Sequence, residues 1–143
     1  MLKEKDLIIL SHLRNNARKS LALISRETEI PVSTLFCKIR KLENNVITKH
    51  TSIIDFNKLG YPIRANFAVK SRDKKKLKEF LLNHKNINSI HRISNYDFFI
   101  DVLFRNMNEL SEFEEELDRY AEKIERFHIV EELKSENFLV NFS

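Results

Sequence analysis

Residues 30–50 read IPVSTLFCKIRKLENNVITKH, and the architecture of the first part of the chain can be predicted from them. At about 100° per residue, as in an α-helix, Leu35, Ile39 and Leu42 fall on one aliphatic stripe. The opposite face carries polar and basic groups from Ser33, Cys37, Arg40, Lys41 and Asn44. The spacing therefore predicts a helix over residues 32–44 that buries its stripe and presents hydrogen-bond donors outward.

The outer face of this predicted helix suits the major groove of double-stranded DNA. Arg and Lys donate to guanine acceptors in that groove, and Ser and Thr bond bases or phosphates. The residues that we predict at the groove are Ser33, Thr34, Phe36, Cys37, Arg40 and Lys41. Those that we predict to lie toward the phosphates are Lys38, Lys49 and His50. The alternative is an amphipathic helix whose outer face is simply solvated.

Two shorter helices are predicted before this one. The first has an apolar stripe and ends near residues 15–16; the stripe includes Leu7, Ile9, Leu10 and Leu13. Ser20 is the predicted N-cap of the second, because its hydroxyl can accept a hydrogen bond from an unpaired amide of the first turn. Pro31 ends that second helix.

The segment after the third helix predicts a small β-hairpin. Asn45 is expected in the left-handed conformation that commonly ends a helix, because asparagine substitutes for glycine there. β-Branched residues in 46–56 predict two short strands joined by a basic turn at Lys49 and His50. Three helices followed by this hairpin make a winged helix-turn-helix.

A second domain is predicted after Gly60, where strand-like runs alternate with helical ones. The predicted strands are 63–70, 87–94, 97–105 and 126–133, and the predicted helices are 73–84 and 107–124. That order is the βαββαβ ferredoxin-like motif, so the fold class is α+β. The predicted domains are 1–51, a hinge at 52–61 and 62–143. Residues 136–142 form a C-terminal strand or arm whose apolar side needs cover, for which a partner subunit is a natural candidate.

Composition and charge narrow the class of protein. With 42% hydrophobic and 32% charged residues among 143, the chain is expected to fold as a soluble protein. No run approaches the roughly 20 apolar residues of a membrane span, so we expect a cytoplasmic protein. A lone cysteine, Cys37, excludes an internal disulfide. The first 60 residues carry a net charge of +5 and the rest −1, which favours an anionic partner for the first part.

Other candidate chemistry is sparse. The five histidines lack the spacing of metal ligands, and we predict no catalytic residue, metal site or cofactor. The acidic run in 112–118 resembles a general acid/base cluster or, alternatively, is a solvated helix face. The basic run 71–80 is either a contact for an anionic surface or the exposed side of a helix. Cys37 beside basic residues also allows redox control of DNA binding.

Three segments resemble one known family. They are KDLIILSHLRNNARKS (5–20), STLFCKIRKLE (33–43) and VITKHTSIIDFNKLG (46–60), and they are similar to the leucine-responsive regulator/AsnC (Lrp/AsnC) family of transcription factors. The resemblance implies a DNA-binding winged helix-turn-helix joined by a hinge to a regulatory domain that dimerises and binds amino acids. It also implies homodimers that pair through their sheets, assemble into tetramers or octamers, and bind near-palindromic sites.

The resemblance further implies an effector loop at SNYDFFI, residues 94–100, where either Asn95 replaces the family's glycine or a residue is missing. The implied effector-binding residues are Ser94, Asn95, Tyr96 and Asp97, with a ligand's ammonium near Asp97. The alternative is a turn that Asp97 caps. One enzymatic alternative also stays open, because sirohaem decarboxylases share this two-domain layout; His91 and Arg92 are the residues that hint at one.

Overall fold

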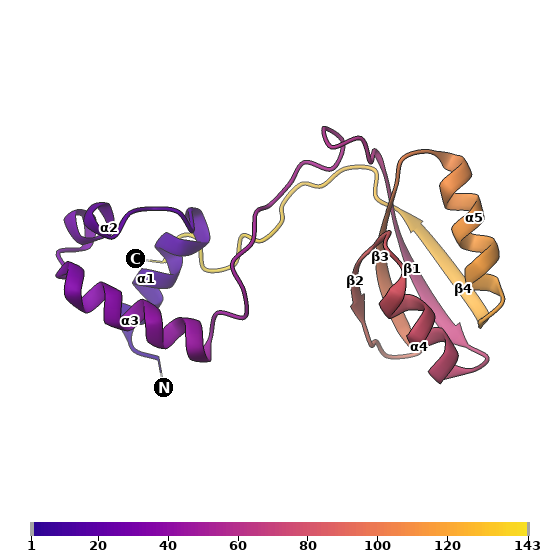
Figure 1. The fold of residues 1–143 in the computed structure, drawn as a ribbon, viewed down its shortest axis with the longest axis horizontal. Helices are drawn as coiled ribbons and strands as arrows, with labels where there is room; N and C mark the ends of the chain where they lie inside the picture. Colours follow the sequence, from indigo (N-terminus) through magenta and orange to yellow (C-terminus); the bar gives the residue numbers. More distant parts are fainter. Residues whose placement is uncertain (1, 143) are drawn as a thin grey trace. The chain divides into compact units, whose positions relative to one another are not determined.

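The computed structural model describes residues 2–142, and the chain divides into two compact units (Figure 1). Unit 1 comprises Met1–Ser52 together with Leu133–Ser143, and unit 2 comprises Ile53–Glu132. The C-terminal residues, expected in the second domain, thus group with the first unit. In the described part of the chain, no helix is long and apolar enough to cross a membrane.

Unit 1 is built from three helices: α1 (Glu4–Asn15), α2 (Leu21–Thr28) and α3 (Val32–Asn45). Their apolar stripes meet in a core of Ile9, Leu10, Ile24, Ile30, Leu35 and Leu42. The predicted cap of α2 is confirmed, because the Ser20 hydroxyl accepts a hydrogen bond of 3.1 Å from the N–H of Leu23.

Two expectations for the end of α3 are wrong. Asn45 remains in the helix, and its side-chain amide donates to the carbonyl of Lys41 at 2.9 Å instead of ending the helix in a left-handed conformation. The two short strands expected in 46–56 do not form in the structure. An isolated hairpin is marginally stable without a third strand or a face to pack on, and Ile53 and Ile54 are exposed. The structure therefore shows no two-stranded wing within residues 46–56.

The C-terminal arm, residues 133–142, packs on unit 1. Leu139 contacts the helical core, while Arg14 Nε donates to the carbonyl of Phe138 at 3.0 Å. Asn15 Nδ2 donates to the carbonyl of Val140 at 2.7 Å. No strand forms within residues 133–142. The arm is therefore held by hydrogen bonds from side chains of α1 and by the packing of Leu139, and not by β-sheet hydrogen bonds.

Unit 2 is a four-stranded antiparallel sheet with two helices, in the chain order β1, α4, β2, β3, α5, β4. The bounds are β1 Ile63–Ser71, α4 Lys74–Asn83, β2 Ile87–His91, β3 Phe98–Phe104, α5 Met107–Asp118 and β4 Ala121–His128. The strand order in the sheet is β2-β3-β1-β4, with Phe67 opposite Ile100 on the central pair. The class is thus α+β.

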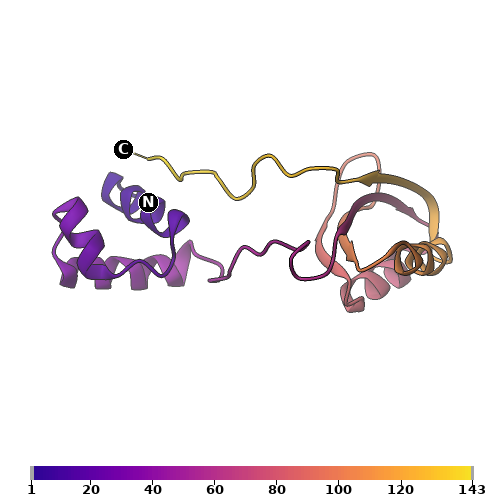
Figure 2. The ribbon, with the colours of Figure 1, turned by 90° about the horizontal axis from the view of Figure 1, so that it is seen from above.

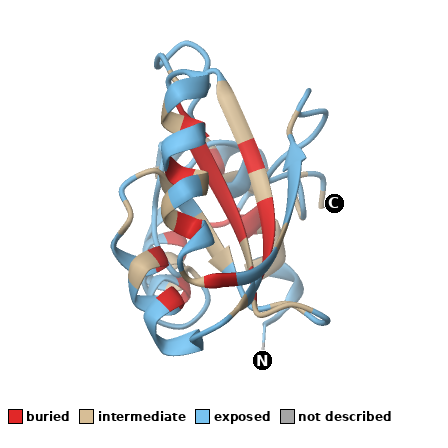
Figure 3. Cartoon of the chain, turned by 90° about the vertical axis from the view of Figure 1, so that its right-hand side faces the viewer, coloured by how far each residue is buried: buried red, intermediate tan, exposed pale blue. Residues whose placement is uncertain are grey.

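Both helices cover the same face of the sheet (Figure 2). Alternate residues of β1 and β3 point to this face, including the buried Phe67 and Ile100, and meet Leu77 of α4 and Phe113 of α5. In Figure 3 the buried residues lie along the central strands and on the sheet-facing side of a helix. The other face of the sheet carries no helix in the described part of the chain.

The end of unit 2 differs from the expectation. The helix predicted to reach residue 124 ends at Asp118, and the strand predicted at 126–133 is β4, which begins at Ala121. A tight turn breaks the helix, because the N–H of Tyr120 bonds the carbonyl of Leu117 at 3.0 Å. The buried Ala121 then pairs with Ser71 at the start of the strand. β2 is also shorter than expected and ends at His91.

Candidate nucleic-acid interface

The turn between α2 and α3 sets the direction of α3. Glu29 adopts a left-handed conformation with φ of 63°, and its N–H bonds the carbonyl of Ser25 at 2.7 Å. The Thr28 hydroxyl donates to the carbonyl of Ile24 at 2.6 Å and accepts from the N–H of Ile30 at 3.3 Å. Ile30 is buried in the core of unit 1. A non-glycine residue in this conformation costs free energy, so the contacts around it hold a defined helix-turn-helix.

The inner face of α3 anchors the helix as its spacing predicts. Leu35 and Leu42 are buried, and Ile39 packs against the same cluster. Burial of a leucine side chain contributes roughly 1.5–3 kcal/mol, so two such residues two turns apart fix the rotation of the helix about its axis. The opposite face must then point to solvent.

The outer face of α3 brings together most of the residues predicted at the groove. Five of them are exposed, Ser33, Phe36, Cys37, Arg40 and Lys41, and Thr34 is partly buried. The guanidinium carbon of Arg40 lies 5.6 Å from the centroid of the Phe36 ring, which is 51% exposed. This is the arrangement of a cation on an aromatic face, and it keeps the guanidinium over the exposed side of the helix.

The predicted phosphate contacts have different surroundings. Lys38 Nζ lies 3.4 Å from the Asp6 carboxylate, which ties α3 to α1 and competes with a phosphate contact. The backbone N–H of Lys3, with help from Lys38, holds the pKa of Asp6 below its ordinary value, so this carboxylate stays charged. Lys49 is exposed. His50 Nε2 lies 2.9 Å from Glu43 Oε2 at the end of α3.

The predicted effector residues surround a turn between β2 and β3 in unit 2. Asn95 has φ of 69°, the left-handed conformation that favours glycine. Asp97 Oδ2 accepts hydrogen bonds from the hydroxyl of Ser71 at 2.6 Å and from its N–H at 2.8 Å. The Tyr96 hydroxyl donates to Glu125 at 2.6 Å, and this bond raises the pKa of Tyr96. Ser94 is exposed.

No model of a protein family matches the sequence. Individual relatives do match it. The chain is 34% identical over 116 residues to the HTH-type transcriptional regulator FL11 of Pyrococcus horikoshii, a match that covers 78% of this chain and 77% of FL11. It is 26% identical over 114 residues to the uncharacterized HTH-type transcriptional regulator YezC of Bacillus subtilis, covering 78% of this chain and 82% of YezC.

The chain belongs to the Lrp/AsnC family of HTH-type transcriptional regulators. Solved structures of the family share its fold. LrpC of B. subtilis superposes with a TM-score of 0.87 at 21% identity, covering 94% of this chain and 99% of LrpC. AsnC of E. coli gives a TM-score of 0.81 at 17% identity, covering 94% and 96%. The regulator NMB0573 of Neisseria meningitidis, solved with L-Met, gives 0.85 at 18% identity, covering 94% of each chain.

Some contacts of this Lrp/AsnC protein were missed by sequence reasoning. The stacking of Arg40 on Phe36 had a local signal, because residues four apart lie on one side of a helix. The ion pair of Lys38 with Asp6 had no local signal in the sequence, because the two residues lie on different helices. The same is true of Ser71 with Asp97, which come from different segments of unit 2.

Cys37 is a free, exposed thiol on the outer face of α3. His91 and Arg92, the residues that hinted at an enzyme, are both exposed at the end of β2. Within the part of the chain that the structure describes, no group of three or more His, Cys, Asp and Glu side chains is arranged to hold a metal ion.

Proposed function

We propose that this Lrp/AsnC protein binds double-stranded DNA as a sequence-specific regulator of transcription, with the outer face of α3 in the major groove. The observation that carries the proposal is the division of α3: Leu35 and Leu42 are buried, and Arg40 stands exposed over Phe36. A helix held by its inner stripe can insert its outer face into the groove without rearrangement. The role is regulatory, and we assign no reaction to the chain.

Each side chain of the interface has a defined part in this proposal. Arg40 and Lys41 donate to base acceptors, and Ser33, Thr34 and Cys37 lie at the base edges. Lys49 and His50, just beyond α3, meet the phosphates. Lys38 forms an ion pair with Asp6, so it stabilises unit 1 and contributes less to phosphate binding than Lys49.

The second unit supplies the twofold symmetry that a near-palindromic site requires. We assign it to the ferredoxin-like class, and we propose that two copies pair through the sheet face that carries no helix. That face presents Phe127, which is 45% exposed, and the partly buried Phe99. A second copy would cover these rings, because an isologous contact matches one face with itself. The two α3 helices of such a dimer would then bind the two half-sites of the DNA.

The test of this function compares two variants on specific and random duplexes. Arg40→Ala should relax specificity at one base-pair position, by about 1 to 3 kcal/mol. Lys49→Ala should weaken binding to all sequences alike and reduce the dependence of affinity on salt by about one phosphate contact. Equal losses by both variants on both kinds of DNA would contradict the assignment.

We further propose that the loop at 94–97 is the place where a small amino-acid-like effector would act. Asn95 adopts a left-handed conformation with φ of 69°, which glycine adopts readily, and this supports the proposal. The Asp97 carboxylate already accepts two hydrogen bonds from Ser71, so a ligand's ammonium would have to share it. Isothermal titration calorimetry with each of the twenty amino acids tests this proposal. If none of them gives a heat of binding, the proposal of an amino-acid effector is wrong.

A further inference from the structure

The chain crosses between unit 1 and unit 2 twice. The first connection, residues 46–62, runs from the end of α3 to the start of β1, and the second, residues 129–135, runs from the end of β4 into the C-terminal arm. The second connection has little free length, because only three residues separate Glu132 from Glu136, whose carboxylate pairs with Arg14 of unit 1 at 3.1 Å. A chain that is joined at two points has fewer conformations than one joined at a single point, so the second connection limits the freedom of the first.

Arg64, near the start of β1, holds the end of both connections in unit 2. Its Nη1 donates to Oε2 of Glu132, the last residue of unit 2, at 2.8 Å. Its guanidinium carbon lies 5.6 Å from the centroid of the Phe56 ring, which belongs to the first connection. The carbonyl of Arg64 also accepts a hydrogen bond of 2.9 Å from the N–H of Ile129. One residue thus fastens the chain where it enters unit 2 and where it leaves.

The guanidinium of Arg64 is itself fixed by the sheet. Its Nε and Nη2 donate to the two carboxylate oxygens of Asp101 on β3 at 2.8 Å. Nδ2 of Asn88 on β2 donates to the same carboxylate at 2.9 Å. A bidentate arginine–carboxylate pair has a defined geometry, so three strands together determine where the remaining donor and the face of the guanidinium point.

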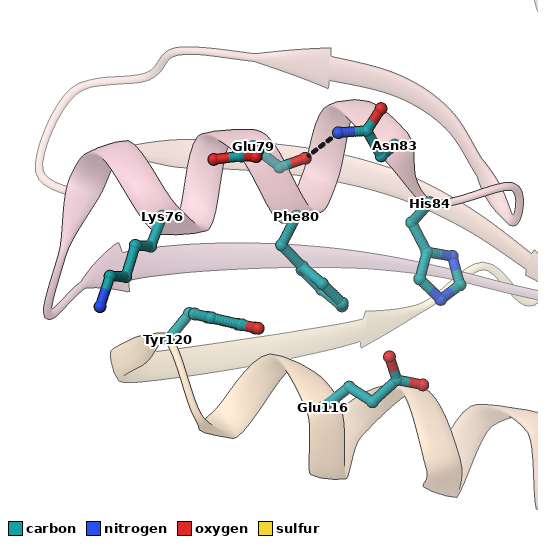
Figure 4. Close-up of a pocket in the computed structure, with 7 residues that line it drawn as sticks. All are labelled: Lys76, Glu79, Phe80, Asn83, His84, Glu116 and Tyr120. Atoms are coloured by element: carbon teal, nitrogen blue, oxygen red, sulfur yellow. Dashed lines mark hydrogen bonds between the residues drawn. The ribbon is translucent and has the colours of Figure 1, made fainter.

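These contacts lie on the face of the sheet that carries no helix. Phe67 of β1 points to the helix-bearing face, so Arg64, three residues earlier, points to the opposite one. The helix-bearing face instead has a groove of about 650 Å³ between α4 and α5 (Figure 4). All residues that line this groove come from 76–84 and 116–120, whereas the Arg64 contacts involve both connections. Arg64 therefore lies on the face through which the proposed dimer pairs.

We propose that Arg64 is a positioning residue for DNA recognition. By holding Phe56 and Glu132 it sets the direction in which both connections leave unit 2, and so it narrows the range of half-site spacings that a dimer accepts. This role rests on the proposed function, because it requires two α3 helices that are held by one pair of second units. Arg64 acts through the connections and touches no DNA. Both contacts can be removed without unfolding unit 2, because Phe56 is only partly buried and the Glu132 side chain is 45% exposed.

Binding of full-length protein to duplexes with one half-site, or with two at varied spacing, tests the proposal. The half-site is the one enriched from random duplexes. Wild-type protein should bind the selected spacing roughly 100-fold more tightly than a spacing changed by about 5 base pairs, because half a helical turn moves one half-site to the far side of the duplex. Phe56→Ala/Glu132→Gln should reduce this difference to about tenfold or less. Its affinity for a single half-site should equal that of wild type, because no residue of α3 changes.

Leu59→Ala/Glu116→Gln is the matched control. It removes an exposed apolar side chain from the first connection and a carboxylate from the groove in Figure 4, and it leaves every contact of Arg64 in place. This control should keep the spacing difference of wild type. Urea denaturation of both double variants should give a free energy of unfolding close to that of wild type, because Arg64 keeps its pair with Asp101.

Trypsin reports the state of the connections without DNA. Lys58 lies in the first connection and Lys134 in the second. Cleavage at both should be several-fold faster in Phe56→Ala/Glu132→Gln than in wild type or the control, because proteolysis follows local opening. An unchanged spacing difference, an equal loss of affinity on single half-sites, or unchanged cleavage would each overturn the role of Arg64. A wild type that binds one and two half-sites equally well would overturn the proposed dimeric recognition, and the role of Arg64 with it.

Discussion

The guanidinium of Arg40 lies on the face of the Phe36 ring, 5.6 Å from its centroid and one helical turn away on α3. An exposed contact of this kind contributes about 0.5–1 kcal/mol. The contact also orients Arg40, because the Phe36 ring restricts a long side chain that otherwise samples many rotamers. The two residues therefore act together at the proposed DNA interface.

Replacing Phe36 by alanine should weaken binding to the selected DNA site without unfolding unit 1. The loss of about 0.5–1 kcal/mol of support for Arg40 corresponds to roughly a twofold to fivefold rise in Kd. Fluorescence anisotropy with a labelled duplex measures it. Phe36→Tyr keeps the ring and should bind as the wild type does. Unchanged affinity in Phe36→Ala would show that the ring does not support Arg40.

The Arg64–Asp101 pair in unit 2 predicts a large effect on stability. Nε and Nη2 of Arg64 each donate to the Asp101 carboxylate at 2.8 Å, and Asp101 is only 8% exposed. Arg64→Met leaves a buried carboxylate without its cation, and we expect a loss of about 3 kcal/mol in the free energy of unfolding. Urea denaturation measures it. Arg64→Met/Asp101→Leu removes both charges and should recover most of the loss; no recovery would mean that the carboxylate was not the cause.

Asp97 predicts how the stability of unit 2 depends on pH. The hydroxyl and the N–H of Ser71 hold the pKa of Asp97 below its ordinary value. A carboxylate with a lowered pKa in the folded state contributes stability above its unfolded pKa, near 3.9, and this contribution is lost as pH falls through the folded value. Urea denaturation between about pH 2.5 and 6 should therefore show a shallower acid decline in Asp97→Asn than in wild type.

Ser71→Ala provides the control for that measurement. It removes the donated hydroxyl bond but keeps the carboxylate, so it should also make the acid decline shallower. Glu109, another carboxylate of unit 2 with a lowered pKa, keeps part of the decline in both variants. An acid decline as steep as that of wild type in both variants would contradict the role of this contact.

The C-terminal arm should stabilise unit 1 through one side chain. Leu139 packs on the helical core, whereas its neighbour Phe138 is 85% exposed. Leu139→Ala should lower the free energy of unfolding of unit 1 by about 1 kcal/mol, because its burial is partial. Phe138→Ala, a matched neighbour, should change it by less than about 0.5 kcal/mol. Thermal unfolding followed by circular dichroism distinguishes the two, and equal effects would mean that the arm is not docked by Leu139.

Local signals in the sequence predicted much of the fold. The stripe of Leu35 and Leu42, the Ser20 cap and the start of α5 at Met107 each depend on residues within one or two turns, and all agree with the structure. The sheet strands β1 and β3 were also located, because their apolar residues are confined to short runs.

The misses have physical causes that lie outside a single segment. The strands expected in 46–56 have high β-propensity but no third strand to pair with, so propensity alone does not order them. The predicted helix 107–124 was too long because residues 119–124 are compatible with either a helix or a strand. In the structure, pairing of Ala121 with Ser71 favours the strand. Asp97 was predicted from a loop motif, yet its partner Ser71 lies at the end of β1, far away in the sequence.

The proposed contact between the outer face of α3 and the major groove can be tested by selecting bound fragments from random duplexes, with wild-type protein and Arg40→Ala in parallel. We predict that wild-type protein enriches a near-palindromic site whose half-sites lie about one helical turn, or a multiple of it, apart. Arg40→Ala should recover the same spacing with one position in each half-site relaxed. Failure of the wild type to enrich any sequence, or recovery of an identical site by Arg40→Ala, would contradict the placement of the α3 outer face in the groove.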